Sequence, residues 1–333
     1  DGVVYFDVQS FPKYGKLSGN TLDSLRSGEG GRVDMETQAV KKTPADFMLW
    51  KPDPSHLMRW SSPWGEGYPG WHLECSVMAR SILGEVIDLH SGGEDNIFPH
   101  HDCEIAQSDG AFGHPVVRQW AHVRFLQVDG GKMSKSVGNV FTVRDVLEKG
   151  FRASALRYVL LSVHYRKQLK FTWDSLSQAD EALTRLMDCL VRLDTVPQSG
   201  VETTVTEKVE VSRRDFSEMM KADLNTPGAL GVMFDFVRMV NAAIDAGEIS
   251  SSDVTLVRET FEYFDQVLGV IRIRRAEDTV PPVPVEEIEK LIGDRKAARS
   301  NRDFTKADRI RDELAERGIM LEDGSAGTRW KRK

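Results

Sequence analysis

Two lysines lie three residues apart in a short loop rich in glycine and serine, Gly130-Gly-Lys-Met-Ser-Lys-Ser136. The loop begins at the turn signal Asp129-Gly130, directly after an apolar segment. Such a loop can fold over a polyphosphate, and the ammonium groups of Lys132 and Lys135 can neutralise the charge that develops as pyrophosphate leaves. The same composition also suits a solvated surface loop, so the spacing alone leaves both interpretations open.

A second group of residues could bind a metal ion. His100 and Glu104 are four residues apart, so on a helix they share one face, and Cys75 could reach them from the segment 70–75. Thiolate, imidazole and carboxylate are all zinc ligands. Taken alone, the helical pair is equally explained as a surface pair and the cysteine as core packing. Cys103, three residues after His100, lies near the same helix face and could act as a substitute ligand, but inert packing is the expectation.

A third group, His90-Ser-Gly92-Gly93-Glu-Asp95, ends a predicted strand and leads into a predicted helix. In open α/β sheets, ligands bind at the carboxyl ends of the strands. The glycines allow a backbone to approach a ligand closely, and a helix N-terminus favours an anion. An ordinary turn explains the pattern as well.

The first half of the chain alternates strand and helix patterns. Strands are predicted at Glu85–His90 and His122–Val128, with a helix over Phe98–Ser108 between them, which indicates an α/β fold with a largely parallel sheet. After Ala153, apolar residues recur at three- and four-residue spacing and predict a helix bundle. Its predicted helices are Ala155–Val163, Trp173–Leu193, Ser212–Lys221, Thr226–Ala246 and Ser252–Val270.

The remaining segments complete the predicted organisation. Val201–Val211 is predicted as a loop and Asp278–Pro284 as a semi-rigid linker. Two further helices are predicted over Val285–Ser300 and Phe304–Arg317. Three domains follow: a catalytic part over 1–163, a helical bundle over 164–275 and a small C-terminal domain over 276–333.

Composition narrows the class of protein. The 44 Lys and Arg against 51 Asp and Glu give a net charge of −7, and 40 % hydrophobic residues with 29 % charged residues are typical of a globular protein. No apolar run approaches the ~18 residues of a membrane-spanning helix. Three cysteines, Cys75, Cys103 and Cys189, are too few for a disulfide scaffold and favour a reducing cytoplasm.

Several longer strings resemble the cysteinyl-tRNA synthetases, a family of class I aminoacyl-tRNA synthetases. They are Trp60–Ala79, His90–Ser108 and Gly130–Asn139, the last of which contains the class I signature KMSKS. The opening segment, His164–Leu176, Asp223–Leu230 and Lys306–Trp330 are similar too, so the resemblance covers nearly all 333 residues. It implies the second half of a Rossmann-type nucleotide-binding fold, followed by an all-α bundle and a small C-terminal domain.

The resemblance also implies roles for single residues on the amino-acid side of the site. One zinc ion would be bound by Cys75, His100 and Glu104 and would hold the thiolate of the substrate L-cysteine. Zinc binds a soft thiolate far better than the hydroxyl of serine, so no editing domain is needed. Trp71 matches the tryptophan of the amino-acid pocket, and Asp95 is the candidate for holding the α-ammonium group.

On the nucleotide side, the resemblance implies that His90, Gly92 and Gly93 line the ATP pocket. Lys135 would contact ATP, with Lys132 in support, and Mg²⁺ would accompany ATP. The implied reaction forms cysteinyl-adenylate and then transfers cysteine to tRNA(Cys), in a monomeric cytoplasmic enzyme that has no contact with membranes.

The basic end of the chain is the predicted tRNA contact. From Arg295 to Lys333 there are 12 Lys and Arg against 7 Asp and Glu. The last five residues place cations around an aromatic ring, which suits phosphate contacts and stacking on unpaired bases. These residues are Arg329, Trp330, Lys331, Arg332 and Lys333.

Two departures from the family pattern are visible. The HIGH tetrapeptide and the fourth zinc ligand, a cysteine just before it, are absent, and residue 1 is Asp. We therefore expect a fragment that lacks the N-terminal, HIGH-containing part and so lacks two pieces of the catalytic machinery. Two alternatives remain open: a mycothiol-pathway ligase that uses the same cysteine adenylation, and a non-catalytic tRNA-binding paralogue.

Overall fold

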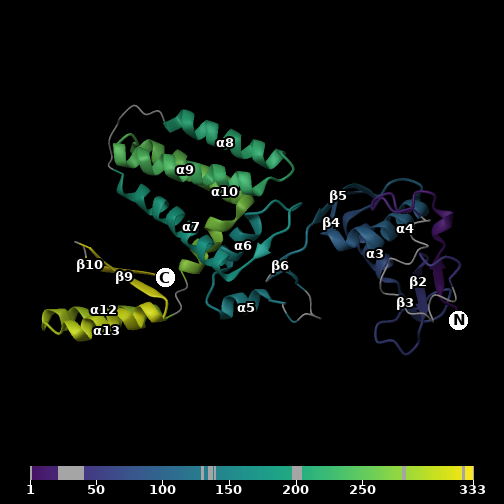
Figure 1. Cartoon of the computed structure of the whole chain (residues 1–333), viewed down its shortest axis with the longest axis horizontal. Helices are drawn as coiled ribbons and strands as arrows, with labels where there is room; N and C mark the ends of the chain where they lie inside the picture. Colours follow the sequence, from purple (N-terminus) through teal and green to yellow (C-terminus); the bar gives the residue numbers. More distant parts are fainter. Residues whose placement is uncertain are drawn as a thin grey trace. The chain divides into compact units, whose positions relative to one another are not determined.

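The computed structural model describes residues 2–21, 41–128, 131–133, 138, 140–196, 205–279, 283–324 and 327–332. The chain forms two compact units, one of residues 1–126 with 165–168 and the other of residues 127–164 with 169–333. Figure 1 labels the elements of both units. The domain boundaries predicted near residues 163 and 275 stay a prediction.

The first unit opens with a small antiparallel sheet. Its strand order is β1 (Val4–Phe6), β2 (Phe47–Pro52) and β3 (Gly67–Pro69). The short helix η1 (Val8–Ser10) follows β1. The sheet packs on a small apolar core, formed by Val8, Tyr14, Phe47, Cys103 and Ala106.

A strand–helix–strand unit follows, as predicted. β4 (Ile87–Gly93) and β5 (Val117–Val123) are parallel, with His90 beside Trp120. The chain between them forms η2 (Glu94–Asn96), η3 (Ile97–His101) and α4 (Asp102–Phe112).

The predicted strand His122–Val128 is wrong, because β5 ends at Val123 and a separate strand β6 covers Gln127–Val128. The backbone N–H of Arg124 donates to the carbonyl of Tyr165, and that of Gln127 donates to Leu169. The apolar run therefore pairs with other segments after β5 ends.

Helix α3 (Trp71–Leu83) is placed by polar contacts. None of its 13 residues, all of which the structure describes, is buried. The side-chain amide of Gln107 on α4 donates to the carbonyl of His72 at 2.5 Å and to the hydroxyl of Ser76 at 2.6 Å. Ser108 adds a hydroxyl contact to Ser76 at 3.1 Å. These bonds hold α3 against α4 along the face that carries Cys75.

The second unit begins with a three-stranded sheet in the order β7 (Gly131–Lys132), β6 and β8 (Lys170–Phe171). The KMSKS signature begins at Lys132, the last residue of β7, and its residues 134–136 lie outside the described part of the chain. Helix α5 (Val143–Glu148) follows the loop and starts with a capping box, in which the Thr142 hydroxyl accepts from the N–H of Asp145 and the Asp145 carboxylate accepts from the N–H of Thr142.

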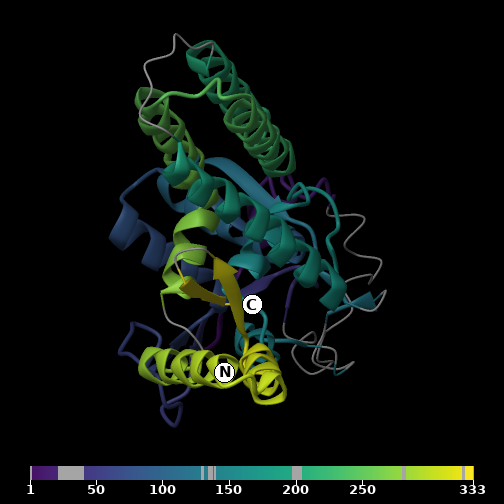
Figure 2. The same cartoon turned by 90° about the vertical axis from the view of Figure 1, so that its left-hand side faces the viewer.

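The predicted bundle is present. Its helices are α6 (Ala153–Leu161), α7 (Trp173–Arg192), α8 (Val205–Lys221), α9 (Thr226–Ala246), α10 (Ser251–Leu268) and α11 (Val270–Asp278), with η4 (Leu193–Thr195) after α7. Helices α8, α9 and α10 pack side by side, as Figures 1 and 2 show. Their apolar faces form one core, in which Phe216, Phe236, Phe261 and Phe264 are fully buried.

The predicted loop Val201–Val211 is partly wrong, because α8 begins at Val205. Val205 and Val209 are buried in the bundle core, four residues apart on one helix face. Burial of the two valines outweighs their low intrinsic helix propensity. Residues 201–204 lie outside the described part of the chain.

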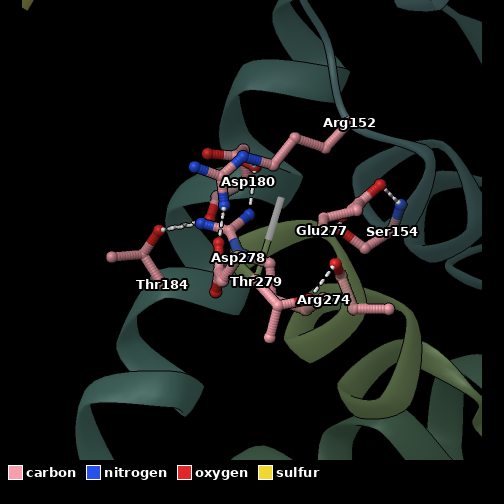
Figure 3. Close-up of polar contacts among 9 residues, drawn as sticks. Arg152, Ser154, Asp180, Thr184, Arg274, Glu277, Asp278 and Thr279 are labelled. Carbon is pink, nitrogen blue, oxygen red and sulfur yellow. Dashed lines mark hydrogen bonds and ion pairs between the residues drawn. The ribbon is translucent and has the colours of Figure 1, made fainter. Parts of the chain in front are cut away.

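A buried charge network joins α6, α7 and α11 (Figure 3). Arg152 donates to the carboxylate of Asp278 at 2.9 Å, and Arg274 donates to Asp180 and, at 3.0 Å, to the hydroxyl of Thr184. Both arginines are almost fully buried. Because a buried cation without a partner is costly, this network fixes the three helices to one another.

The last segment forms two helices and a hairpin. α12 (Val285–Ser300) and α13 (Phe304–Glu316) match the predicted helices closely. The hairpin of β9 (Ile319–Gly324) and β10 (Gly327–Arg332) has no counterpart in the sequence interpretation, which treated the basic end as a tail. Among the described residues, no helix is both long and apolar enough to cross a membrane.

Candidate metal and substrate site

The first unit brings the three predicted zinc ligands together. Cys75 lies on α3, His100 on η3 and Glu104 on α4. One ligand atom from each, a thiol sulfur, an imidazole nitrogen and a carboxylate oxygen, lies within 4.8 Å of the others. The residues thus converge on one point, although 25 residues separate Cys75 from His100 in the chain.

His100 and Glu104, one helical turn apart, are in direct contact with each other. Nε2 of His100 lies 2.8 Å from Oε1 of Glu104. Among the described residues, that oxygen has no partner with hydrogen-bond geometry, although it is buried. On its other side, Nδ1 of His100 lies 2.7 Å from Nδ1 of His72. A hydrogen bond to Nδ1 leaves the Nε2 lone pair for a metal, which is how metal-binding histidines are oriented.

Burial shapes the protonation of this group. His100 and Glu104 are buried, and Cys75 is half-buried. Burial, followed by the charges of Glu104 and Glu74, raises the pKa of the Cys75 thiol. Burial also lowers the pKa of His72 to about 4. The thiol is therefore protonated at neutral pH without a cation, and binding of a metal would release its proton.

Trp71 and Asp95 are the residues that the family resemblance assigns to substrate cysteine. The ring of Trp71 lies over His100, with ring centroids 4.3 Å apart, and 62 % of the side chain is exposed. Trp71 is thus beside the candidate metal ligands and open to solvent. Asp95 is exposed on η2, directly after β4.

The glycines predicted to line the nucleotide pocket accommodate side chains of this unit. A Cβ atom on Gly92 would lie 2.7 Å from Cε1 of His101, and one on Gly93 would lie 2.5 Å from Oδ1 of Asp95. The ring of the buried His101 therefore restricts position 92 to glycine, whereas the exposed Asp95 side chain could rotate away from a larger residue at position 93. His90, at the same end of β4, stacks on Trp120 with ring centroids 4.7 Å apart.

Sequence reasoning missed a set of histidines around the predicted ligands. Besides His90 and His100, they include His72, His101 and His122, so the group contains five of the eight histidines in the chain. Nδ1 of His101 lies 2.8 Å from Nε2 of His122, and burial lowers the pKa of His101 to about 3. The adjacent pair His100-His101 and the spacing of His72 from Cys75 were the available signals.

Cys103 behaves as expected for packing. It is 1 % exposed, belongs to the apolar core of the first unit and lies 3.4 Å from the hydroxyl of Tyr14. Burial raises the pKa of its thiol to about 12. A buried neutral thiol of this kind is a poor metal ligand.

The other predicted residues belong to the second unit. Lys132 ends β7, whereas Lys135 lies outside the described residues. Arg329, Trp330, Lys331 and Arg332 form most of β10, and Lys333 lies outside the described residues. The indole N–H of Trp330 donates to Glu289 at 3.1 Å, and its ring packs against the C-terminal core, so this aromatic is partly engaged within the domain.

Comparison with known proteins was made against family models and individual sequences. A model of the class I (C) tRNA synthetase catalytic domain matches residues 1–181, and a DALR domain model matches residues 215–272. A model of the cysteinyl-tRNA ligase anticodon-binding domain matches residues 284–330.

Individual proteins that match along the whole of this chain agree with these family models. The chain is 41 % identical to a cysteine–tRNA ligase of Geobacter sulfurreducens over 348 residues, which cover all of this chain and 71 % of the relative. It is 45 % identical to the cysteine–tRNA ligase of Alkalilimnicola ehrlichii, of which it covers 70 %. The chain belongs to the cysteine–tRNA ligase family. The α/β fold followed by a helix bundle and a small C-terminal domain is thereby confirmed for this family member.

Membership of the cysteine–tRNA ligase family allows a comparison with the two alternatives that the sequence left open, the mycothiol-pathway ligase and the non-catalytic paralogue. The cysteinyl-tRNA ligase anticodon-binding model matches the C-terminal segment. The matches to complete ligases run over the whole chain. Neither the mycothiol-pathway ligase nor the non-catalytic paralogue is favoured by these matches.

Proposed function

We propose that this ligase-family chain activates L-cysteine with ATP and transfers it to tRNA(Cys), with one zinc ion bound by Cys75, His100 and Glu104. The observation that carries the proposal is the convergence of these three ligand atoms within 4.8 Å. Thiolate, imidazole and carboxylate fit zinc, and the buried Oε1 of Glu104 faces Nε2 of His100 at 2.8 Å. When bound, zinc would supply an affinity for the substrate thiolate that serine cannot match.

The residues of the chain have separate tasks in this proposal. His72 orients His100 through the 2.7 Å contact between their Nδ1 atoms. Trp71, whose ring is tilted against that of His100 and which is open to solvent, would cover the bound amino acid. Asp95 would accept from the α-ammonium group, since a carboxylate is the natural partner of an ammonium ion.

For the nucleotide, we assign His90, Gly92, Gly93, Lys132 and Lys135. Lys135 stabilises the charge that grows as pyrophosphate departs from Mg-ATP, so its contribution belongs to the transition state. Lys135→Ala in the full-length protein should slow cysteine-dependent ATP–pyrophosphate exchange by about 10²–10³-fold, as loss of an oxyanion donor does. The affinity for cysteine, measured by equilibrium binding, should be unchanged.

A matched control is Lys208→Ala. Lys208 is an exposed lysine on α8, more than 70 residues after Lys135 in the sequence. This control should exchange pyrophosphate at the parental rate. Exchange that is equally fast in Lys135→Ala and the control would refute the role assigned to Lys135.

For tRNA, we assign the basic end, Arg329 to Lys333. Since β10 pairs with β9, deletion of this segment would also break the hairpin, so a single charge change is the cleaner test. Arg329 is exposed and lies opposite Glu322 in the hairpin. Arg329→Gln should weaken tRNA(Cys) binding and reduce the salt slope by about one unit, while cysteine activation is unchanged. An unaltered salt slope would remove Arg329 from the tRNA contact.

We also propose a cytoplasmic, monomeric enzyme. Three cysteines, all free, support a reducing compartment. The monomeric state rests on the family resemblance and stays a prediction, which sedimentation of the full-length protein would test.

A further inference from the structure

The Glu104 carboxylate is buried between two histidines. Its Oε1 lies 2.8 Å from Nε2 of His100, and its Oε2 lies 3.7 Å from Nδ1 of His90. The two oxygens therefore point to two different nitrogen ligands. A carboxylate in this position can serve two metal ions at once, one at each oxygen.

The second oxygen belongs to a complete ligand group. One ligand atom each of His90, His101 and Glu104 lies within 4.8 Å of the others. His101 is 2 % exposed, and its Nδ1 lies 2.8 Å from Nε2 of His122. If His101 donates the Nδ1 hydrogen to His122, the lone pair of Nε2 remains for a metal.

This arrangement repeats that of the first site. His122 holds His101 as His72 holds His100, each through a nitrogen–nitrogen contact of 2.7 to 2.8 Å. Such outer histidines fix the ring orientation and tautomer of metal ligands. Each of the two ligand groups thus contains a histidine that is held by an outer histidine, and the two groups share the Glu104 carboxylate.

The backbone leaves room for the second group. A Cβ atom at Gly92 would lie 3.1 Å from Nε2 of His101 and 2.7 Å from its Cε1, so a larger residue would displace the ring. A cavity of about 260 Å³ reaches both His90 and Glu104. The cavity thus leaves space for water beside two of the three ligands, while His101 lies behind them in the buried part of the unit.

We propose that His90, His101 and Glu104 form a second transition-metal site, which shares Glu104 with the first. Two imidazoles and one carboxylate select zinc, cobalt or nickel over magnesium. The second site binds more weakly than the first, because it has no thiolate and its carboxylate is shared. Since His90 is assigned to ATP, excess zinc should inhibit cysteine activation; this consequence rests on the proposed function, whereas the metal site does not.

The test is a titration of the metal-free, full-length protein with Co²⁺, followed by absorption spectroscopy. The first equivalent should give a thiolate-to-cobalt charge-transfer band together with d–d bands. The second equivalent should add d–d absorption without charge transfer. Saturation at one equivalent would overturn the second site, whereas a first equivalent without charge transfer would overturn the cysteine-containing site of the proposed function.

Variants separate the two sites. His101→Gln should abolish the second equivalent and keep the first, and Cys75→Ser should weaken the charge-transfer band and keep the second. His122→Gln, which leaves all three ligands in place, should weaken only the second binding step by about 10–100-fold. His114→Gln, at an exposed histidine outside the group, should change neither. A second equivalent of parental affinity in both His101→Gln and His122→Gln would overturn the proposal.

Discussion

Helix α9 of the bundle and helix α3 of the candidate site are held in place by different forces. Seven residues of α9 are buried, and they contribute to one apolar core with the phenylalanines of α8 and α10. No residue of α3 is buried, and all 13 are described; its contacts to α4 include the hydrogen bonds of Gln107 and Ser108 to Ser76 and the guanidinium of Arg80 over the ring of Phe112. Apolar burial thus dominates the packing of α9, whereas α3 is held by hydrogen bonds and by contacts of partly exposed rings.

The difference has a functional meaning. A helix held by apolar packing can lose a polar surface residue at little cost, and its function is then separable from its stability. On α3 the site residues lie next to the residues that contact α4: Cys75 belongs to the candidate ligand group, and His72 contacts His100. Substitutions in the bundle should therefore act on folding, and those at the site should act on metal affinity.

Phe264→Ala should have the largest effect on unfolding. Phe264 is fully buried, and its ring stacks on Phe216 with centroids 4.6 Å apart. Removing a buried phenylalanine ring costs about 3–5 kcal/mol through lost burial and the cavity left behind. Urea unfolding of the full-length protein should show this loss, while zinc affinity of the folded protein is unchanged.

Two further variants calibrate that result. Phe304→Ala, at a phenylalanine that is 60 % exposed, should change stability by less than about 0.5 kcal/mol. Phe264→Leu should lie between the two, because the leucine refills part of the space. A reduced zinc affinity in folded Phe264→Ala would contradict the separation of the two regions.

His72→Gln should lower the affinity for zinc and leave the stability against urea largely unchanged. His72 contacts His100 but belongs to neither ligand group. Loss of such an orienting partner lowers metal affinity by about 10–100-fold, equivalent to about 1.4–2.7 kcal/mol. A competition titration of zinc against a chelator would measure it, with His114→Gln as control. A large loss of urea stability with unchanged zinc affinity would show that His72 serves packing.

Asp323→Asn should have the smallest effect, and one that depends on pH. The Asp323 carboxylate accepts two bonds from the nearly buried Arg295, each 2.8 Å long, and one from Thr328. These bonds hold the pKa of Asp323 well below its usual range. The carboxylate is about half exposed, so we expect a loss of about 1 kcal/mol at neutral pH.

The lowered pKa of Asp323 also predicts how the effect of Asp323→Asn on stability changes with pH. A carboxyl group with a lowered pKa stabilises the fold fully above its unfolded pKa, near 4, and loses that contribution as pH falls towards the folded value. The stability difference between the parent and Asp323→Asn should therefore shrink below about pH 4. A difference that stays constant from pH 7 to pH 3 would show that charge does not carry the effect.

The same contrast explains how much could be read from the sequence. The bundle helix Thr226–Ala246 and the C-terminal helix Val285–Ser300 have the predicted bounds, since apolar spacing or clear end signals define them. In the first unit, strand β5 was misplaced by several residues, because much of it is exposed and its apolar pattern is weak. The C-terminal hairpin was missed, although Asp323-Gly324, a common turn signal, lies at the end of β9.

At the site, the three candidate metal ligands were predictable from the sequence, whereas the histidines that contact them were not. Cys75, His100 and Glu104 were found because residue type and helical spacing limit which side chains can meet. His72, His101 and His122 act through contacts with other side chains, and those contacts depend on how α3, η3 and β5 come together. The adjacent pair His100-His101 and the spacing of His72 from Cys75 were visible in the sequence, but neither pattern fixes which of these side chains meet.

X-ray absorption at the zinc edge of the full-length protein tests the central claim most directly, because it counts the sulfur atoms bound to the metal. If zinc bound by Cys75, His100 and Glu104 selects the substrate, addition of L-cysteine should increase the number of zinc–sulfur bonds by one. Addition of L-serine at the same concentration should leave the number unchanged. A zinc environment that does not respond to cysteine would contradict the account.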